Sequence, residues 1–217
     1  GINIGEVIVG IAGQEIKGST HRGNIMKSSQ SDEFNIYDVQ RLINDMYKTA
    51  TPPGTEIIDV IPQEYLIDYD LTTKDPVGTI GARLEGEFQI ITAPTKDVAV
   101  INKSLQRASM TSPEGLICDR IIVNSLASSL AVLSEEDKDA GVALIDIGSG
   151  TTDIAVFYDG ILRYTTVIPY GGDIITSDIR QGCMVTQQQA EQLKTKFGKA
   201  LAEKIRDNEV ISIPGLR

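Results

Sequence analysis

The stretch from Val142 to Phe157 limits most strongly what this chain can fold into. Two apolar runs rich in β-branched residues, 142–147 and 154–157, flank the tetrapeptide Gly148-Ser149-Gly150-Thr151. Each run is typical of a strand, and a glycine-rich tetrapeptide between two strands is typical of a tight turn. The sequence therefore predicts a β-hairpin around which the rest of the chain is organised.

The tip of this hairpin has the features of a phosphate-binding loop. We expect Gly148 and Gly150 to turn with positive φ, so that successive N–H groups point at one anion. Asp146 ends a strand that we expect to be buried, where its carboxylate needs a cation or donors, and a phosphate-bound Mg²⁺ meets that need. A glycine pair between two strands is, taken alone, most often a simple β-turn that binds nothing.

Length, charge and cysteine usage exclude several classes of protein. The 217 residues are enough for one large domain or two small ones. A net charge of −10 argues against nucleic-acid binding, which needs clustered Lys and Arg. Cys118 and Cys183 lie far apart without a metal-ligand motif and are predicted to be buried thiols. No signal peptide or membrane-length apolar run is present, which predicts a cytosolic protein, and the start at Gly1 suggests a fragment.

The first part of the chain, residues 4 to 94, is expected to form a compact α+β unit of about 90 residues. Asn35 and Asp38 are spaced as a capping box at the start of a helix. His21 has no second candidate ligand or base beside it and is assigned to the surface. The expected elements are a strand at 4–12, a loop at 17–33, a helix from 36 to the Pro-Pro-Gly stop at 52–54, and strands at 57–62, 65–69 and 84–92.

Helices and strands alternate in the remaining part, which predicts an α/β fold with a mixed sheet covered by helices. The charged run 134–140 is expected to be a solvated loop. Glu191 and Lys194 share a helix face, and their spacing alone indicates an ordinary surface ion pair. The expected elements are helices at 97–108, 124–133 and 173–183, a helix between Thr186 and Gly198, and strands at 116–123, 142–147, 154–157 and 161–168.

Longer motifs make the interpretation more specific. The string Asp146-x-Gly-x-Gly-Thr-Thr-Asp153 resembles the second phosphate loop of the actin, heat-shock-70 and sugar-kinase superfamily. Further stretches resemble one branch of that superfamily, the FtsA family of bacterial cell-division proteins. These stretches are Val60-Ile-Pro-Gln-Glu-Tyr-Leu-Ile-Asp68 with 75–78 and 81–84, Asn124–Leu133 with 141–146, and Gly171-Gly-Asp-Ile-Ile-Thr176 with Ala190, Glu191 and Lys194.

The resemblance implies an actin-like (ribonuclease H-like) fold with a site for ATP and Mg²⁺. In such a site Asp146 holds the metal through water, and the amides of the glycine turn hold the β- and γ-phosphates. Asn124 falls near the position that orients the attacking water, and because Asn cannot act as a base, we expect at most a weak ATPase. The residues that the resemblance assigns to the nucleotide are Gly148, Ser149, Gly150, Thr151, Gly171, Gly172, Glu191 and Lys194.

The resemblance also implies a division of the chain into subdomains. Residues 4–94 correspond to the SHS2-like subdomain 1C, which contacts neighbouring subunits and later division proteins. Residues 95–198 correspond to the return into subdomain 1A followed by subdomain 2A with the phosphate loop. Residues 199–217 correspond to the start of subdomain 2B, through which the family binds the C-terminal tail of FtsZ.

At the level of the whole protein, the resemblance implies an adaptor that polymerises into filaments. Such an adaptor tethers FtsZ to the inner face of the cytoplasmic membrane at the division septum through a C-terminal amphipathic helix. We expect that helix and the first phosphate loop to lie outside this chain, and the chain alone to be inactive. Two alternatives share the superfamily, an active ATPase or phosphotransferase such as a sugar kinase and a pilus-assembly relative, and the Pro62-Gln-Glu-Tyr65 block argues against both.

Overall fold

The computed structural model describes residues 5–28, 32–109, 116–201 and 210–212. The chain divides into two compact units. Unit 1 comprises Gly1–Asp146 and Asp153–Ile168, and unit 2 comprises Ile147–Thr152 and Pro169–Arg217. Among the described residues, no helix is long and apolar enough to cross a membrane.

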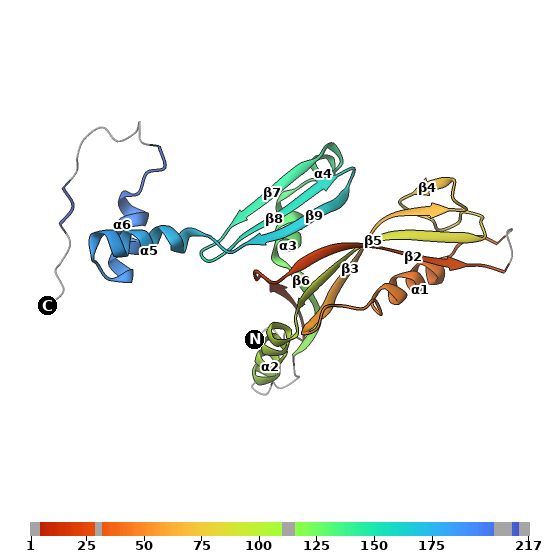
Figure 1. Cartoon of the computed structure of the whole chain (residues 1–217), viewed down its shortest axis with the longest axis horizontal. Helices are drawn as coiled ribbons and strands as arrows, with labels where there is room; N and C mark the ends of the chain where they lie inside the picture. The colour runs from red at the N-terminus through yellow and green to blue at the C-terminus, as the bar shows by residue number, and fades with distance from the viewer. Residues whose placement is uncertain (1–4, 29–31, 110–115, 202–209, 213–217) are drawn as a thin grey trace. The chain divides into compact units, whose positions relative to one another are not determined.

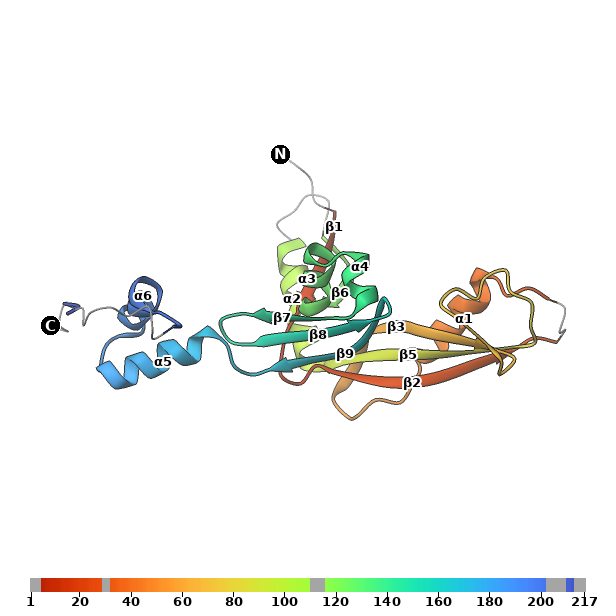
Figure 2. The same ribbon diagram turned by 90° about the horizontal axis from the view of Figure 1, so that it is seen from above.

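The largest sheet of unit 1 is antiparallel and has its strands in the order β2-β5-β3-β4 (Figures 1 and 2). These strands span β2 (Lys17–Met26), β3 (Thr55–Ile67), β4 (Leu71–Thr73) and β5 (Arg83–Pro94). Helix α1 (Ile36–Met46) packs on one face of the sheet and buries Val39 and Leu42 against Phe34, Phe88 and their neighbours. An apolar core between one helix and one sheet face therefore holds this region together.

The sequence-based prediction of a loop at 17–33 is wrong, because residues 17–26 form strand β2. This strand pairs with β5 along its whole length, from Lys17 opposite Thr92 to Met26 opposite Arg83. The polar composition of this segment favours a loop. Strand formation, however, depends more on pairing with a neighbouring strand and on one buried face than on local propensity. Gly23 lies against the Met46 and Leu42 side chains of α1, and a Cβ there would require the flexible end of Met46 to shift.

The prediction of separate strands at 57–62 and 65–69 is also wrong, because β3 runs through both. The pairing register with β5 shifts between Pro62 and Glu64, which is where a strand tolerates a residue without an N–H. On its other edge β3 pairs with β4 only over Tyr65–Ile67, so no ladder partner is lost at Pro62. The strand ends at Ile67, and the next two residues, Asp68 and Tyr69, have φ angles of 47° and 68°.

The capping box at Asn35 is confirmed. The Asn35 side chain accepts hydrogen bonds from the N–H groups of Tyr37 and Asp38, and the Asp38 carboxylate accepts from the Asn35 N–H at 2.9 Å. Helix α1 ends at Met46, earlier than the Pro-Pro-Gly sequence predicts, and Tyr47 is its C-cap. Local hydrogen bonding therefore sets the start of this helix more clearly than its end.

The predicted elements around residues 95–133 are confirmed. Strand β1 (Glu6–Ile11) pairs in parallel with β6 (Ile117–Val123). Helices α2 (Thr95–Ser109) and α3 (Asn124–Val132) both contact β6. A second apolar cluster joins these elements to β5 and includes Ile11, Ile91 and Val123. Cys118 is half-buried and Cys183 is exposed, so the prediction of buried thiols is wrong for Cys183.

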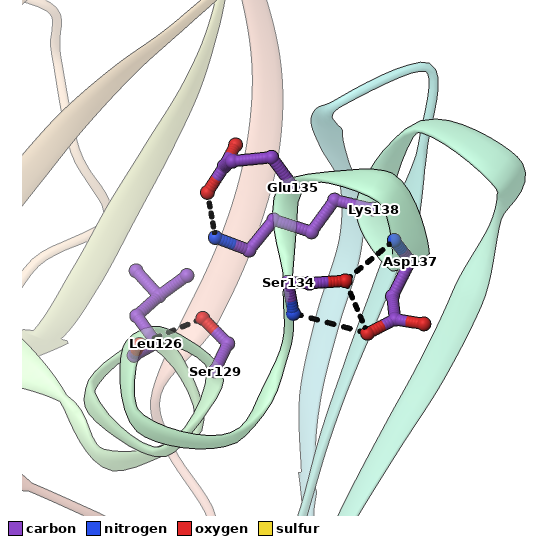
Figure 3. Close-up of polar contacts among 6 residues, drawn as sticks. All are labelled: Leu126, Ser129, Ser134, Glu135, Asp137 and Lys138. Atoms are coloured by element: carbon purple, nitrogen blue, oxygen red, sulfur yellow. Dashed lines mark hydrogen bonds and ion pairs between the residues drawn. The ribbon is translucent and has the colours of Figure 1, made fainter.

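The charged run 134–140 is not a loop but contains a short helix, α4 (Glu135–Ala140). Ser134 and Asp137 form a capping box at its start, as Figure 3 shows. The Lys138 side chain is only 7% exposed, and its ammonium lies 2.7 Å from a Glu135 carboxylate oxygen and 5.9 Å from the centre of the Phe157 ring. A buried lysine stem with a paired head explains why a highly charged segment packs as a helix.

The predicted glycine hairpin and the strand after it are confirmed. They form a sheet in the order β7-β8-β9, made of β7 (Val142–Ile147), β8 (Thr152–Tyr158) and β9 (Ile161–Ile168). The expectation that β7 is buried is wrong, since Ile145 is 57% and Ile147 is 71% exposed. The apolar contacts of this sheet come instead from Ala155, Phe157 and Leu162.

Unit 2 contains helices α5 (Gly172–Cys183) and α6 (Gln187–Phe197). The predicted capping box of α6 is confirmed, because the Thr186 side chain accepts from the Gln189 N–H and the Gln189 side chain accepts from the Thr186 N–H. Met184, in the left-handed conformation, ends α5 and turns the chain toward α6.

Candidate functional site

The loop 148–151 is bound directly to the first turn of α5 within unit 2. The Gly172 N–H donates to the Gly148 carbonyl at 3.0 Å, and the Asp173 N–H donates to the Ser149 carbonyl at 2.8 Å. The Thr152 hydroxyl adds a bond to the Tyr170 carbonyl at 2.7 Å. Two N–H groups that a helix start leaves without a partner are thus used to fix the shape of the loop.

Gly171 is the point at which these two segments come closest. A Cβ at this position would lie 2.5 Å from both the Gly148 and the Ser149 carbonyl oxygens, a distance that real Cβ atoms essentially never show. Only glycine therefore allows the loop and the helix start to pack in this way. The structure gives a physical reason for this predicted site residue that does not depend on a ligand.

The expected positive φ angles at Gly148 and Gly150 are not observed, because neither residue is among the positive-φ glycines of the described chain. The turn is closed instead by a hydrogen bond from the Gly148 N–H to the Thr151 carbonyl at 2.9 Å. Within the described residues, the N–H groups of Ser149 and Gly150 have no hydrogen-bond partner. Two successive donors are therefore available for an anion, fewer than the sequence motif led us to expect.

Glu191 and Lys194 are brought together with the start of α5. The Lys194 ammonium lies 2.8 Å from Glu191 Oε2 and donates to the Gly172 carbonyl at 3.1 Å. The Thr176 hydroxyl donates to the same carboxylate oxygen at 2.6 Å. The ion pair that spacing predicts is present, and it is also anchored to the peptide that follows Gly172.

The charge state of Glu191 follows from these contacts. Hydrogen bonds from the Lys194 ammonium and the Thr176 hydroxyl hold the pKa of the Glu191 carboxyl below its ordinary value. Its side chain is 46% exposed, so the ionised carboxylate faces solvent while one oxygen is held. A fixed, ionised acceptor of this kind can bind a hydroxyl donor of a ligand.

Asp146 and Asn124 lie in unit 1. The Ser128 hydroxyl donates to Asp146 Oδ2 at 2.7 Å, which ties the end of β7 to α3. Asn124 and Ser128 are one helical turn apart and therefore share a face of α3. A Cβ at Gly10 would lie 2.3 Å from Asn124 Oδ1, so the Asn124 side chain rests against the backbone of β1.

A metal bound at Asp146 would depend on its ligand for most of its coordination. No group of three His, Cys, Asp or Glu side chains gathers to hold a metal ion in the part of the chain that is described. A single carboxylate that keeps one oxygen free fits Mg²⁺, which retains several waters and is commonly held by one or two carboxylates together with substrate phosphates.

Thr176 and Ser128 contact predicted site residues but were not themselves predicted from the sequence. Thr176 is fully buried and four residues after Gly172, and Ser128 is four residues after Asn124. The helical period of 3.6 could have pointed to both, because residues four apart lie on the same face. Their partners Glu191 and Asp146 are distant in sequence, however, and only the packing of the elements shows the contacts.

A separate cavity of about 380 Å³ lies in unit 1 and contains none of the predicted site residues. It is lined by parts of β3, β9, α3 and α4, including Ser129 and Lys138, which Figure 3 draws. At its side the Arg120 guanidinium contacts both carboxylate oxygens of buried Asp59, at 2.9 and 3.1 Å. The charged groups of Lys74, Arg120 and Lys138 beside it are each paired with a carboxylate.

Comparison with solved structures first defines the class of protein. The chain resembles a chain of the PilM-PilN type IV pilus biogenesis complex with a TM-score of 0.58 and 15% identity, covering 89% of this chain and 51% of that one. At this identity the likeness concerns the fold alone. The fold is the actin-like α/β fold that the sequence predicts.

Comparison with protein families then identifies the family. The model described as "Cell division protein FtsA" matches residues 143–217, and the model described as "SHS2 domain inserted in FTSA" matches residues 13–92. Cell division protein FtsA is 37% identical over 98% of this chain in Neisseria meningitidis, 35% over 100% in Pseudomonas aeruginosa and 34% over 98% in Escherichia coli K12. The chain belongs to the FtsA family of cell-division proteins.

The chain spans about half the length of the curated relatives that it matches, 50% in Neisseria meningitidis and in Pseudomonas aeruginosa and 49% in Escherichia coli K12. What the whole protein does is therefore a matter for proposal and experiment.

Proposed function

We propose that this chain is part of an ATP-binding, actin-like adaptor of bacterial cell division. Membership of the FtsA family supports the role in division. The observation that carries the nucleotide proposal is the fixed junction of loop 148–151 with the start of α5, where Gly171 leaves room for two hydrogen bonds between the segments. The junction holds the loop in one shape and leaves the N–H groups of Ser149 and Gly150 to bind a polyphosphate ligand.

In this proposal each part of the nucleotide meets a group with matching chemistry. The free N–H groups of Ser149 and Gly150 bind the phosphates, and the carboxylate of Asp146 holds Mg²⁺ through water. The ionised Glu191 carboxylate accepts from the ribose, beside the Lys194 ammonium. The proposed nucleotide residues are Gly148, Ser149, Gly150, Thr151, Gly171, Gly172, Glu191 and Lys194, with Asp146 for the metal.

We propose that ATP acts mainly as a conformational ligand, with slow hydrolysis or none. Asn124, at the position that the resemblance links to the attacking water, has an amide that cannot accept a proton as a base. Its side chain rests against the β1 backbone at Gly10. A ligand of this kind stabilises the conformation that binds it best, so the conformational change depends on ATP binding and not on ATP hydrolysis.

The partners of the adaptor follow from the proposed subdomains. We assign residues 4–94 to subdomain 1C, residues 95–198 to subdomains 1A and 2A, and residues 199–217 to the start of 2B. We propose that subdomain 1C contacts neighbouring subunits and later division proteins and that 2B binds the FtsZ tail. The whole protein then forms filaments and links FtsZ to the membrane at the septum through a C-terminal helix.

Replacement of the proposed metal residue tests the nucleotide site. In the full-length protein, Asp146→Ala should weaken ATP binding in the presence of Mg²⁺ and remove the difference between titrations with and without Mg²⁺. Asp119→Ala, which removes an exposed carboxylate on β6, is the matched control and should change neither. An ATP affinity that is the same in wild type and Asp146→Ala would sink the assignment of this residue.

A pilus-assembly relative is the second candidate, because the PilM-PilN complex has a similar fold. Titration of the full-length protein with a peptide of the FtsZ C-terminal tail separates the two. Saturable binding supports the division adaptor, and no binding at concentrations up to about 1 mM, a free energy near −4 kcal/mol, would favour the pilus-type module.

A further inference from the structure

The two donors that hold Glu191 both reach the same carboxylate oxygen. The Thr176 hydroxyl at 2.6 Å and the Lys194 ammonium at 2.8 Å contact Oε2. Within the described residues, Oε1 has no hydrogen-bond partner, although nearly half of the side chain is exposed. The carboxylate is therefore held by one oxygen and offers the other.

Thr176 is the more restrictive of the two donors. It is fully buried, so water cannot take the place of its hydroxyl. Its hydroxyl also lies 3.3 Å from the Gly172 carbonyl, but a hydroxyl has one proton to donate, and the shorter contact to the charged oxygen at 2.6 Å takes it. A β-branched side chain in a helix interior has few rotamers, so the positions open to the Thr176 hydroxyl oxygen are restricted.

Lys194 holds the carboxylate less selectively. Its ammonium has three protons, and one of them is used by the Gly172 carbonyl at 3.1 Å. A rotating ammonium on a flexible stem can follow either carboxylate oxygen. The orientation of the Glu191 carboxylate, and hence the direction in which Oε1 lies, therefore depends mainly on Thr176.

We propose that Thr176 is a positioning residue that fixes Glu191 Oε1 as the acceptor for a ribose hydroxyl and so makes the site select ribonucleotides over deoxyribonucleotides. The inference rests on the proposed nucleotide function and adds a specificity determinant to it. An ionised carboxylate oxygen is an acceptor only, and a ribose hydroxyl is a donor that the corresponding deoxynucleotide lacks. Loss of one hydrogen bond to a charged group corresponds to a factor of about ten or more in affinity.

The test compares nucleotide affinities of the full-length protein. ATP, 2′-deoxy-ATP, 3′-deoxy-ATP and inorganic tripolyphosphate are titrated against wild type, Thr176→Val, Thr176→Ser and Glu191→Ala. Wild type should prefer ATP over at least one deoxy analogue by about tenfold or more. Thr176→Val, which keeps the shape and removes the donor, should reduce this preference below about twofold, and Thr176→Ser should restore it.

Two readouts separate positioning from a general structural effect. Affinity for tripolyphosphate, which has no ribose, should stay within about twofold of wild type in Thr176→Val, because that ligand loses no hydrogen bond. Thr195→Val, an exposed threonine on α6, is the matched control and should keep the full preference for ATP. A structural defect would instead weaken all four ligands together.

The outcomes distinguish this inference from the function on which it rests. Full preference for ATP in a folded Thr176→Val protein overturns the role of Thr176 while leaving ATP binding intact. Equal affinity of wild type for all three nucleotides also overturns it. No binding of any nucleotide to wild type overturns the proposed function itself. Should Thr176→Val not fold, Glu191→Ala decides, because preference for ATP retained without an acceptor at this position contradicts the proposal.

Discussion

The α1 face of the antiparallel sheet in unit 1 and the α5–α6 region of unit 2 are held together by different forces. The first has an apolar core with Phe34, Leu42, Leu84 and Phe88 at no more than 1% exposure. In the second, Ala190 is the only buried apolar residue among those described, and polar contacts from Thr176, Glu191 and Lys194 connect the helices.

This difference indicates which region of the protein a bound ligand can stabilise. Apolar burial is non-directional and is complete without a ligand, so the α1 face should be rigid and insensitive to nucleotide. Polar contacts in a half-exposed region are individually worth little and can be supplemented by those of a ligand. We therefore expect substitutions in the sheet to change stability, and substitutions in unit 2 to change mainly binding.

The largest effect on stability should come from Leu42→Ala. Leu42 is fully buried between α1 and the sheet, and its truncation should lower the free energy of unfolding by about 2–5 kcal/mol. Urea denaturation measures the change, with exposed Arg41→Ala as the control expected within about 0.5 kcal/mol of wild type. A loss below about 1 kcal/mol for Leu42→Ala would contradict the contrast between the two regions.

Gly171→Ala should have the largest effect on binding. The new Cβ would meet the Gly148 and Ser149 carbonyl oxygens at 2.5 Å, so the loop has to move away from α5. We expect ATP affinity of the full-length protein to fall about tenfold or more, a change of about 1.4 kcal/mol or more. Calorimetric or fluorescence titration measures it.

Gly182→Ala is the matched control for that substitution. It lies in the same helix, and a Cβ there would meet nothing within 4 Å. Because alanine is the better helix former, this variant should keep ATP affinity and gain about 0.5–1 kcal/mol of stability. Equal ATP affinity in both glycine variants would show that the loop junction is irrelevant to nucleotide binding.

A smaller effect should appear in the pH dependence of stability. The pKa of Glu191 is lowered in the folded state, chiefly by Lys194 and then by Thr176. A lowered folded pKa contributes stability that is present above the unfolded pKa and is lost as the pH falls through the folded pKa. The melting temperature of wild type should therefore exceed that of Glu191→Gln near neutral pH, and the difference should shrink from about pH 5 to about pH 3.

A difference in melting temperature between wild type and Glu191→Gln that stays constant or grows as the pH falls would contradict this prediction. Lys196→Met, which removes an exposed ammonium on the same helix, is the matched control. It should leave the pH profile of wild type unchanged in shape, because the Glu191 carboxylate is paired with Lys194 and not with Lys196.

The smallest expected effect concerns helix α4. Ser134→Ala removes the side chain that accepts from the Asp137 N–H and should cost about 1 kcal/mol of stability. Glu136→Gln, an exposed first-turn substitution outside the capping box, should cost less. If chemical denaturation finds no loss for Ser134→Ala, polar contacts around α4 contribute less than its geometry indicates.

The sequence allowed good prediction of several features whose determining contacts are local, although the local capping box of Ser134 and Asp137 was not among them. The capping boxes at Asn35 and Thr186 and the turn at 148–151 involve residues within four positions of each other, and all were found. Strand β2 was missed because its pairing with β5 joins residues such as His21 and Phe88, which are far apart in the chain. Polar composition without that partner favours a loop.

The candidate site shows the same limit. The motif identified Gly148 and Gly171, but the backbone shape of the loop depends on hydrogen bonds from residues 172 and 173, and the expected positive φ angles are absent. Thr176 became visible only through the packing of α5 on α6. Sequence therefore indicated which residues gather, while the structure showed which atoms of those residues are satisfied and which remain available.

The central claim is that the loop junction of unit 2 belongs to a nucleotide site, and that this site binds ATP but hydrolyses it slowly or not at all. Measurement of ATP binding and of ATP hydrolysis tests this claim most directly. Equilibrium affinities for ATP and ADP, together with single-turnover hydrolysis in the same samples of the full-length protein, give both quantities. We predict saturable binding of ATP with little turnover. Rapid turnover would contradict the adaptor and favour an enzyme, and no ATP binding would mean that the glycine hairpin is only a turn.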